Sequence, residues 1–398
     1  MIREHQLAMS VVRRHDDEPC PAHREDAPRR SAAEMAELWR QNRQRLVEDH
    51  RRAHATVAGR PAHMKIELTN FCNLACPMCP HEQMERDVGY MKPELFKRII
   101  DMAAPELEFA YLHHLGESLF HGRIGELIRY GRERGVHLGL STNATYLDHR
   151  KARVLLESGL DFLVISLDGA SPDTYQRMRV GGDFATTVKN VRAFFELKRR
   201  VPNELTVVVQ MIVTEANRHE VDGFARLWAD DGAQVMIKEA RDWAGQVDLK
   251  KELVQIGKAP RSDGGAGRPR RASGADRAAR LPVVPKVDAS QVQHVPCRML
   301  WTELTVLWDG AVVPCVNVFE KQNVVGNLAT QSLDEVWNSR AMRSLRKSHL
   351  ADDVAHIPVC ATCPRHGFDH EEFVRHDQLA QRLENYVRTD LTPRPGLS

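Results

Sequence analysis

The sequence lacks any apolar run close to the roughly 20 residues that a membrane-spanning helix requires. Its first residues, Met1 to His5, lack the apolar core of a secretory signal. It also lacks an excess of either charge, because 56 basic and 54 acidic residues leave a net charge of only +2. Nothing therefore favours a membrane or a nucleic acid as partner, and we expect a cytoplasmic protein.

Cysteine is scarce, with eight residues in 398, but it is not scattered. Cys20 stands alone, and the remaining seven form a group of three and a later group of four. A long chain without a secretory signal is unlike a small disulfide scaffold. Clustered cysteines in such a chain indicate metal ligands rather than disulfides.

The first group is the C-x3-C-x2-C segment formed by Cys72, Cys76 and Cys79, which follows a strand-like run at 64–69. Three thiolates at this spacing can hold one face of a cubane iron–sulfur cluster and leave its fourth iron open to a ligand. Structural zinc favours four ligands. No fourth Cys or His completes a zinc site in this segment, since His81 would be strained as a ligand.

Strand-like and helix-like patterns alternate over the next part of the chain. The strand patterns cover 64–69, 108–113, 136–141, 162–167, 206–213 and 234–238, and the helical patterns cover 93–102, 123–134, 150–158, 184–200 and 218–230. Apolar, branched strands separated by helices predict an α/β fold with a parallel sheet covered by helices. Because six repeats are too few for an eightfold barrel, we expect a partial (β/α)6 barrel. Its chemistry would lie at the C-terminal ends of the strands, where the cysteine segment is placed.

The remaining segments have distinct compositions. Residues 1–30 are charged and predict a disordered tail. Ser31 and Glu34 form a capping-box pattern that opens a helix within 31–63. The barrel would occupy 64–256, a Gly-, Pro- and Arg-rich flexible linker 257–286, and a smaller domain 287–368. A C-terminal helix and tail would follow over 369–398.

The cysteine segment after a first strand resembles that of the radical S-adenosylmethionine (radical SAM) superfamily. This resemblance implies a [4Fe–4S] cluster bound by Cys72, Cys76 and Cys79, with S-adenosylmethionine on the open iron. It further implies that one electron cleaves this cofactor to a 5′-deoxyadenosyl radical. A flavodoxin or a ferredoxin is the expected electron donor.

The resemblance continues after the later strands. Gly116-Glu117 resembles the superfamily's Gly-Gly-Glu motif, with Leu115 in place of the first glycine. It implies that Glu117 receives the methionine ammonium and that Gly116 permits close backbone approach. Ser141-Thr142-Asn143 resembles the Thr-Asn-Gly turn of relatives, with Ala144 in place of the glycine.

Two further pairs complete the expected cofactor site. Ser166 and Arg179 are implied to hold the methionine carboxylate, for which an arginine fork is well suited. Gln210 and Met78 are expected near the adenine, although a plain core strand explains Gln210 equally well. Asp168 and Gly169 fit an ordinary turn. The full expected set is Gly116, Glu117, Ser141, Asn143, Ser166, Arg179, Gln210 and Met78.

The second group begins with Cys297 and Cys315, which frame a predicted hairpin with an Asp309-Gly310 turn, and ends with Cys360 and Cys363. This pattern resembles the SPASM and twitch extensions of radical enzymes. Because no cysteine follows Cys363, the shorter twitch form is favoured, with one auxiliary [4Fe–4S] cluster on all four cysteines. The spacing alone would equally allow zinc. The accompanying radical-type barrel favours the redox cluster.

The two clusters together favour net oxidation of a substrate from which hydrogen has been abstracted, so we expect a dehydrogenase-like radical SAM oxidoreductase. Segments 312–315, 325–328 and 333–346 are similar to the 2-deoxy-scyllo-inosamine dehydrogenase family, which makes a sugar, aminocyclitol or nucleoside the first expected substrate. The alternative is a maturase of ribosomally made peptides. The residues before the first strand lack the strand pattern of a peptide-binding domain. A third alternative is a non-catalytic iron–sulfur electron-transfer protein. In such a protein Glu117, Ser166 and Arg179 would have no cofactor to bind.

Overall fold

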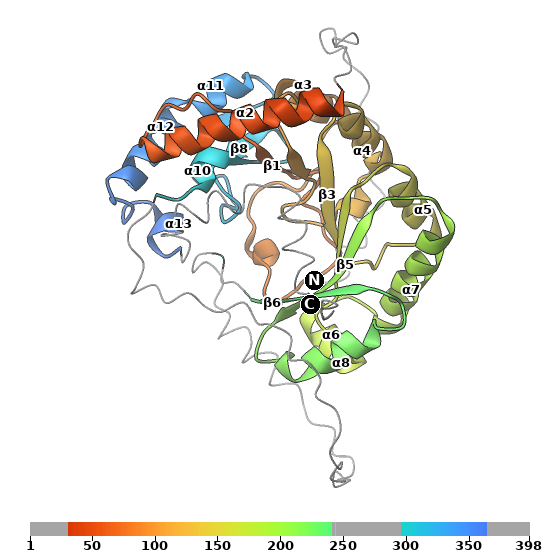
Figure 1. The fold of residues 1–398 in the computed structure, drawn as a ribbon. Helices are drawn as coiled ribbons and strands as arrows, with labels where there is room; N and C mark the ends of the chain where they lie inside the picture. Colours follow the sequence, from red (N-terminus) through yellow and green to blue (C-terminus); the bar gives the residue numbers. More distant parts are fainter. Residues whose placement is uncertain (1–30, 241–242, 244–295, 364–398) are drawn as a thin grey trace, which may run out of the picture.

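The computed structural model describes residues 31–240, 243 and 296–363 (Figure 1). The predicted tail at 1–30 with Cys20, the linker at 257–286 and the C-terminal helix lie outside the described residues. No helix in the described part of the chain is long and apolar enough to cross a membrane.

One nine-stranded sheet organises the molecule, in the order β6-β5-β4-β3-β2-β1-β7-β8-β9. Its first six strands in sequence are β1 (His63–Ile66), β2 (Phe109–Tyr111), β3 (His137–Thr142), β4 (Phe162–Ser166), β5 (Thr206–Val213) and β6 (Gln234–Glu239). All neighbouring pairs among these six are parallel. The prediction of a partial parallel barrel is therefore confirmed.

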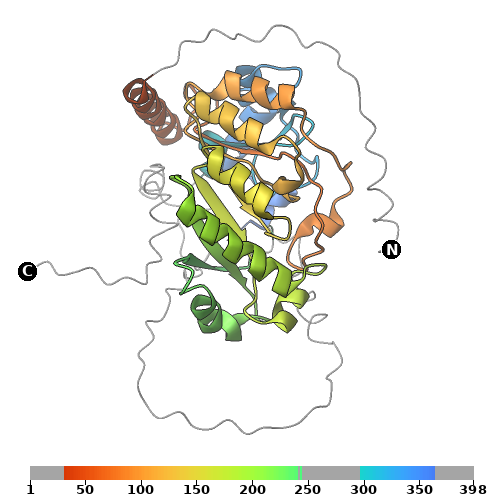
Figure 2. The ribbon, with the colours of Figure 1, turned by 90° about the vertical axis from the view of Figure 1, so that its right-hand side faces the viewer.

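Helices cover the outer face of this sheet and follow one another side by side (Figure 2). They are α3 (Pro93–Ala103), α4 (Ile124–Glu133), α5 (His149–Glu157), α6 (Pro172–Met178), α7 (Phe184–Arg200) and α8 (Val221–Leu227). Several of these helices begin at an N-cap residue whose side chain accepts a backbone N–H. Asp148 caps α5 in this way, and Asp183 caps α7. The expected helix at 218–230 is shorter: η4 (Arg218–Glu220) precedes α8, which ends at Leu227.

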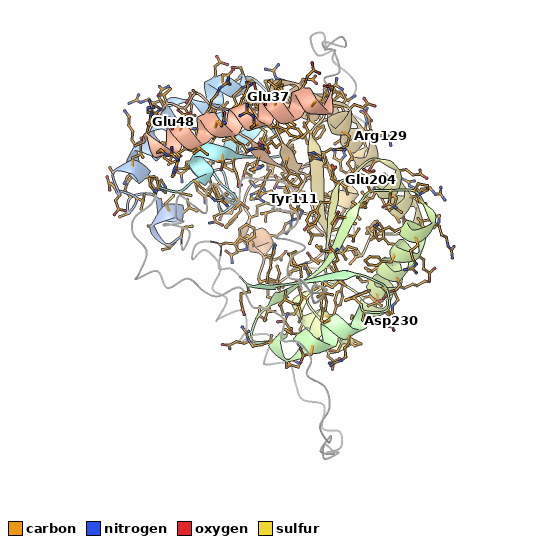
Figure 3. All side chains as sticks on the ribbon, viewed as in Figure 1. Glu37, Glu48, Tyr111, Arg129, Glu204 and Asp230 are labelled. Carbon is orange, nitrogen blue, oxygen red and sulfur yellow. The ribbon has the colours of Figure 1, made fainter. Side chains whose placement is uncertain are left out.

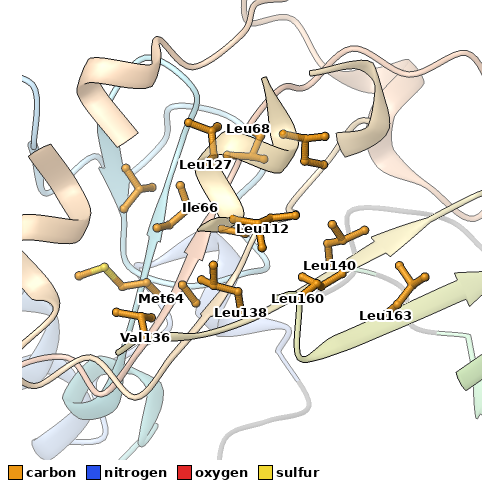
Figure 4. Packing of buried hydrophobic residues seen from close by; sticks show 14 of the residues in the cluster. Met64, Ile66, Leu68, Leu112, Leu127, Val136, Leu138, Leu140, Leu160 and Leu163 are labelled. Atoms are coloured by element: carbon orange, nitrogen blue, oxygen red, sulfur yellow. The ribbon is translucent and has the colours of Figure 1, made fainter. Parts of the chain in front are cut away.

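The core between the sheet and its helices is built from alternate strand residues. Met64 and Ile66 of β1 and Leu138 and Leu140 of β3 point into this cluster, where they are almost completely buried (Figure 4). Since side chains alternate along a strand, the residues between them face the concave side. Tyr111 of β2 accordingly lies toward the centre of the molecule in Figure 3.

The later cysteine-bearing part continues the same sheet. It contains α10 (Met299–Thr302), β7 (Glu303–Val306), β8 (Ala311–Val313), β9 (Gly326–Asn327), α11 (Leu333–Trp337), α12 (Arg340–Leu350) and α13 (Pro358–Ala361). Strand β7 pairs in parallel with β1, with Met64 opposite Leu304, and β8 returns antiparallel to β7. The predicted hairpin is confirmed, with Gly310 in its turn at a φ of 88°. The two cysteine groups therefore share one scaffold.

Helix α2 (Ala32–Arg51) begins at the predicted capping box of Ser31 and Glu34. It packs against α10 of the later cysteine-bearing part (Figure 1). The loop after it is fixed to the later part of the chain, since the Trp337 indole donates to the Gly59 carbonyl at 2.8 Å. Arg346 donates to the Ala55 carbonyl at 3.1 Å. The N-terminal segment thus holds the cysteine-bearing part against the barrel.

Candidate functional site

The first cysteine group lies on the loop that leaves the C-terminal end of β1. Cys72, Cys76 and Cys79 gather with Leu74 and Met78 in one buried cluster. The loop is held by its own turn, in which the Cys79 N–H donates to the Cys76 carbonyl at 2.9 Å. Burial raises the pKa of all three thiols, that of Cys79 to about 12. Because metals bind the thiolate, a cationic group must be present for these side chains to ionise.

Glu117 and Gly116 lie beside this loop, after β2. Gly116 has a φ of 80°, and a Cβ there would meet the Thr69 carbonyl oxygen at 2.5 Å, so only glycine fits. The buried Glu117 carboxylate accepts the N–H of Asn143 at 2.7 Å and that of Leu119 at 3.0 Å. The Thr142 side chain is a third hydrogen-bond partner of this carboxylate. A carboxylate has about four lone-pair positions, so one remains for an ammonium group. Glu117 therefore fixes the local backbone and retains acceptor capacity.

Asn143, at the end of β3, reaches the cysteine loop. Its side-chain amide donates to Asn73 Oδ1 at 3.0 Å and lies 3.9 Å from Cys72 Sγ. Ser141 lies on the concave face of the same strand, with its hydroxyl 2.9 Å from that of Tyr111. The structure thus brings Asn143 to the cysteines, whereas Ser141 belongs to the concave wall next to them.

Arg179, just after α6, is the cation nearest the first cysteine group among the contacts described. Its guanidinium pairs with the fully buried Asp168 at 2.6 Å and approaches Cys76 Sγ at 3.7 Å. Asp168 has a φ of 61° and also accepts the Ile212 N–H at 2.6 Å. The expectation of a plain turn at Asp168 thus misses its ion pair, which only the fold creates. Arg179 Nε is buried without a hydrogen-bond partner in the described structure, so it can still donate to a bound carboxylate.

Two of the other predicted cofactor residues, Ser166 and Gln210, are in contact. Gln210 of β5 donates to the Ser166 hydroxyl of β4 at 3.1 Å, and both side chains are buried on adjacent strands. The Met78 carbonyl accepts the Trp243 indole N–H at 3.3 Å. Trp243 was not predicted, because no local pattern marks a residue that reaches the cysteine loop only through the folded barrel.

The second cysteine group surrounds a cavity with otherwise mainly apolar walls. Cys297, Cys315, Cys360 and Cys363 line it together with Met299, Leu300, Leu345, Ile357 and Val359. Burial raises the pKa of the Cys297 thiol to about 11 and that of Cys360 to about 12. Thiolates on a zinc ion lie about 2.3 Å from it. Four thiols around one cavity can serve as ligands of a zinc ion or of an iron–sulfur cluster.

Buried polar contacts connect the two cysteine-bearing parts. Glu67, at the end of β1, forms an ion pair with Arg86, and both side chains are almost fully buried. Arg86 Nε donates to the Phe319 carbonyl at 2.7 Å, and Glu67 also accepts the Trp308 N–H at 3.3 Å. His114 Nε2 lies 3.1 Å from the Val318 carbonyl oxygen. The loop after β1 is therefore anchored directly to the hairpin of the second group.

Comparison with known families agrees with this arrangement. A model of the radical SAM superfamily matches residues 66–227, and a model of the SPASM iron–sulfur cluster-binding domain matches residues 297–364. The chain contains a radical SAM domain and a SPASM domain. These domains imply a [4Fe–4S] cluster, S-adenosylmethionine and auxiliary iron–sulfur chemistry, as expected. The residues present fit these groups, because three thiols gather near the Arg179 guanidinium, whose Nε is buried without a hydrogen-bond partner, and four thiols line one cavity.

Three similar proteins can be matched to this chain over most of its length. The tungsten-containing aldehyde ferredoxin oxidoreductase cofactor-modifying protein of Pyrococcus furiosus is 25% identical, over 76% of this chain and 86% of its own length. The PqqA peptide cyclase of Streptomyces rochei is 27% identical, over 79% of this chain and 84% of its own. The structure of Streptococcus suis SuiB bound to precursor peptide SuiA matches with a TM-score of 0.56 and 14% identity, over 86% and 76%. The last similarity concerns the fold.

Proposed function

We propose that this protein is a radical SAM maturase that modifies a peptide. The observation that carries this proposal is the similarity to PqqA peptide cyclase, which covers 79% of this chain and so is longer than the radical SAM match at residues 66–227. The peptide alternative therefore replaces the sugar, aminocyclitol or nucleoside as the leading substrate. A dehydrogenase acting on such a small molecule becomes the second candidate.

The residues around the first cysteine group would hold the cofactors. Cys72, Cys76 and Cys79 would bind three irons of a [4Fe–4S] cluster. When bound, this cluster and S-adenosylmethionine supply a radical that abstracts hydrogen from an unactivated carbon. Arg179 would hold the methionine carboxylate through its unpaired Nε, and Glu117 the ammonium group. Their burial excludes water from these charges and strengthens both contacts.

Four further residues would complete the cofactor pocket. Gly116 lets the backbone after β2 pass close to Thr69, which places Glu117 beside the cysteine loop. Asn143 orients the loop through Asn73. Ser166 would hold the methionine carboxylate together with Arg179. Gln210, which donates a hydrogen bond to the Ser166 hydroxyl, would border the adenine together with Met78.

The concave face beyond these residues is the proposed place of the peptide. Tyr111 and Ser141 contribute paired hydroxyls there, and Lys65 Nζ lies 5.0 Å from the Tyr111 ring centre. His113 is near enough to contact the Tyr111 ring edge-on, at 6.2 Å between centres. Burial lowers the pKa of His113 to about 4, helped by the positive charges of Lys65 and Arg179. A neutral imidazole on this wall can accept a hydrogen bond from the peptide.

The proposal is tested with the short peptides encoded beside the gene. The anaerobically reconstituted protein is mixed with S-adenosylmethionine, reduced flavodoxin and each peptide, and the products are analysed by mass spectrometry. Loss of two hydrogens from one peptide, absent with the Cys72→Ala/Cys76→Ala/Cys79→Ala variant, is expected. A parallel panel of aminocyclitols and sugars forms the other arm. Oxidation of one of these, with every peptide unchanged, would refute the maturase.

A further inference from the structure

A buried histidine stands in the wall of the four-cysteine cavity. His349, near the C-terminal end of α12, is only 1% exposed. Its Nδ1 accepts the backbone N–H of Cys297 at 3.4 Å, and its Nε2 lies 3.4 Å from Cys360 Sγ. One imidazole ring therefore connects two of the four cysteines that enclose the cavity.

The first of these contacts determines the tautomer of the ring. A backbone N–H can only donate, so Nδ1 of His349 must be the acceptor and carries no proton. In a neutral imidazole the proton then resides on Nε2, which faces Cys360 Sγ. A thiolate that binds iron can only accept. The geometry therefore makes His349 an N–H donor to this sulfur.

Asn317 makes the corresponding contact with Cys363, the other cysteine of the C-x2-C pair. Its side-chain amide donates to Cys363 Sγ at 3.3 Å, and Asn317 also lines the cavity. Both sulfurs of the Cys360-x2-Cys363 pair thus receive a hydrogen bond from a side chain. The contacts at the first cysteine group are longer, at 3.7 Å from Arg179 and 3.9 Å from Asn143.

We propose that His349 and Asn317 donate hydrogen bonds to the thiolates of Cys360 and Cys363 and thereby raise the reduction potential of the auxiliary cluster. This inference rests on the proposed ligation of that cluster by the four cysteines. Reduction adds negative charge that is shared by the sulfurs, and N–H donors stabilise that charge. Apolar cavity walls increase the effect, because no water competes for the sulfurs. Both are positioning residues that act through the thiolates and make an electron easier to accept.

The test measures the potential directly, in protein that carries only the auxiliary cluster. Cys72, Cys76 and Cys79 are changed to Ala, and the reconstituted protein is titrated with reductant while electron paramagnetic resonance follows the reduced cluster. His349→Leu and Asn317→Leu should each lower the midpoint potential, and the double variant should lower it further. His349→Gln supplies both an acceptor and a donor and should restore most of the shift.

The control is His356→Leu, because His356 is an exposed histidine of the same region whose described contacts are to Ser348 and Asp353. It should leave the potential unchanged. Equal potentials in the parent, His349→Leu and Asn317→Leu proteins at equal iron content would overturn the inference. If His349→Leu loses iron, the potentials of Asn317→Leu and His349→Gln are compared with that of the parent instead. An unchanged potential in Asn317→Leu then overturns the inference. A parent protein without iron would instead refute the four-cysteine assignment.

Discussion

The two cysteine groups differ in what surrounds them. The first has three thiols beside charged and polar groups, among them Glu117, Asp168 and Arg179, at the ends of parallel strands. The second has four thiols in a cavity with mainly apolar walls. A three-thiol site beside buried charges leaves room for a polar ligand on the metal, whereas a four-thiol apolar site is complete by itself. This difference is consistent with the proposed division of roles, in which the first group would hold the cofactor and the second would transfer electrons.

The two groups nevertheless depend on one frame. Strand β7 adds directly to β1, so the hairpin of the second group extends the sheet whose end carries the first. The buried Glu67–Arg86 pair and the contact from Arg86 to Phe319 cross the same boundary. We therefore expect substitution of the cysteines of one group to affect that site alone. Substitution of residues in the shared sheet and its buried ion pair should affect both sites.

The largest expected effect comes from removing one cysteine group at a time. The Cys72→Ala/Cys76→Ala/Cys79→Ala variant should lose about four irons of about eight and form no 5′-deoxyadenosine, because no cluster remains to bind the cofactor. Cys360→Ala/Cys363→Ala should also lose about four irons but retain 5′-deoxyadenosine formation. It should make little oxidised product. Iron analysis and chromatography of both products measure these outcomes.

Folding must be controlled in this experiment, since loss of a cluster can unfold its surroundings. Circular dichroism of each variant has to match the parent before the products are compared. An intact Cys360→Ala/Cys363→Ala protein with normal yields of oxidised product would make the second group structural. Stoichiometric zinc in the Cys72→Ala/Cys76→Ala/Cys79→Ala variant would show that the four cysteines of the second group bind zinc instead of iron.

The shared frame is tested by Arg86→Met. It leaves the Glu67 carboxylate buried and unpaired, where burial already raises its pKa, and should cost about 3 to 5 kcal/mol of unfolding free energy. Urea unfolding measures the loss. The matched control is Arg218→Met, which removes an exposed pair with Glu239 and should cost less than about 1 kcal/mol. Equal losses in the two variants would contradict a structural role for the buried pair.

Much of this arrangement could be predicted from local patterns, and the rest could not. The bounds of β5 and α7 follow from apolar runs and periodicity, and the cysteine spacing indicated both groups. Helix α6 was missed because seven residues are too few for a periodic signal. The pairing of β1 with β7 joins strands that are far apart in sequence. The ion pair of Arg179 with Asp168 depends on the positive φ of Asp168. Such contacts form only in the folded chain, so no local sequence pattern predicts them.

The smallest effect we predict concerns the carboxylate contact at the first group. Arg179→Lys keeps a positive charge against Asp168 but removes the buried Nε donor and the planar fork, so affinity for S-adenosylmethionine should fall about tenfold. Equilibrium dialysis with the reconstituted protein measures it. Arg177→Lys is the matched control, because this arginine lies on α6 two residues earlier and its described contacts are within that helix. It should bind the cofactor normally. Unchanged affinity in Arg179→Lys would remove Arg179 from the cofactor site while leaving both domains in place, since the cysteine ligands are independent of it.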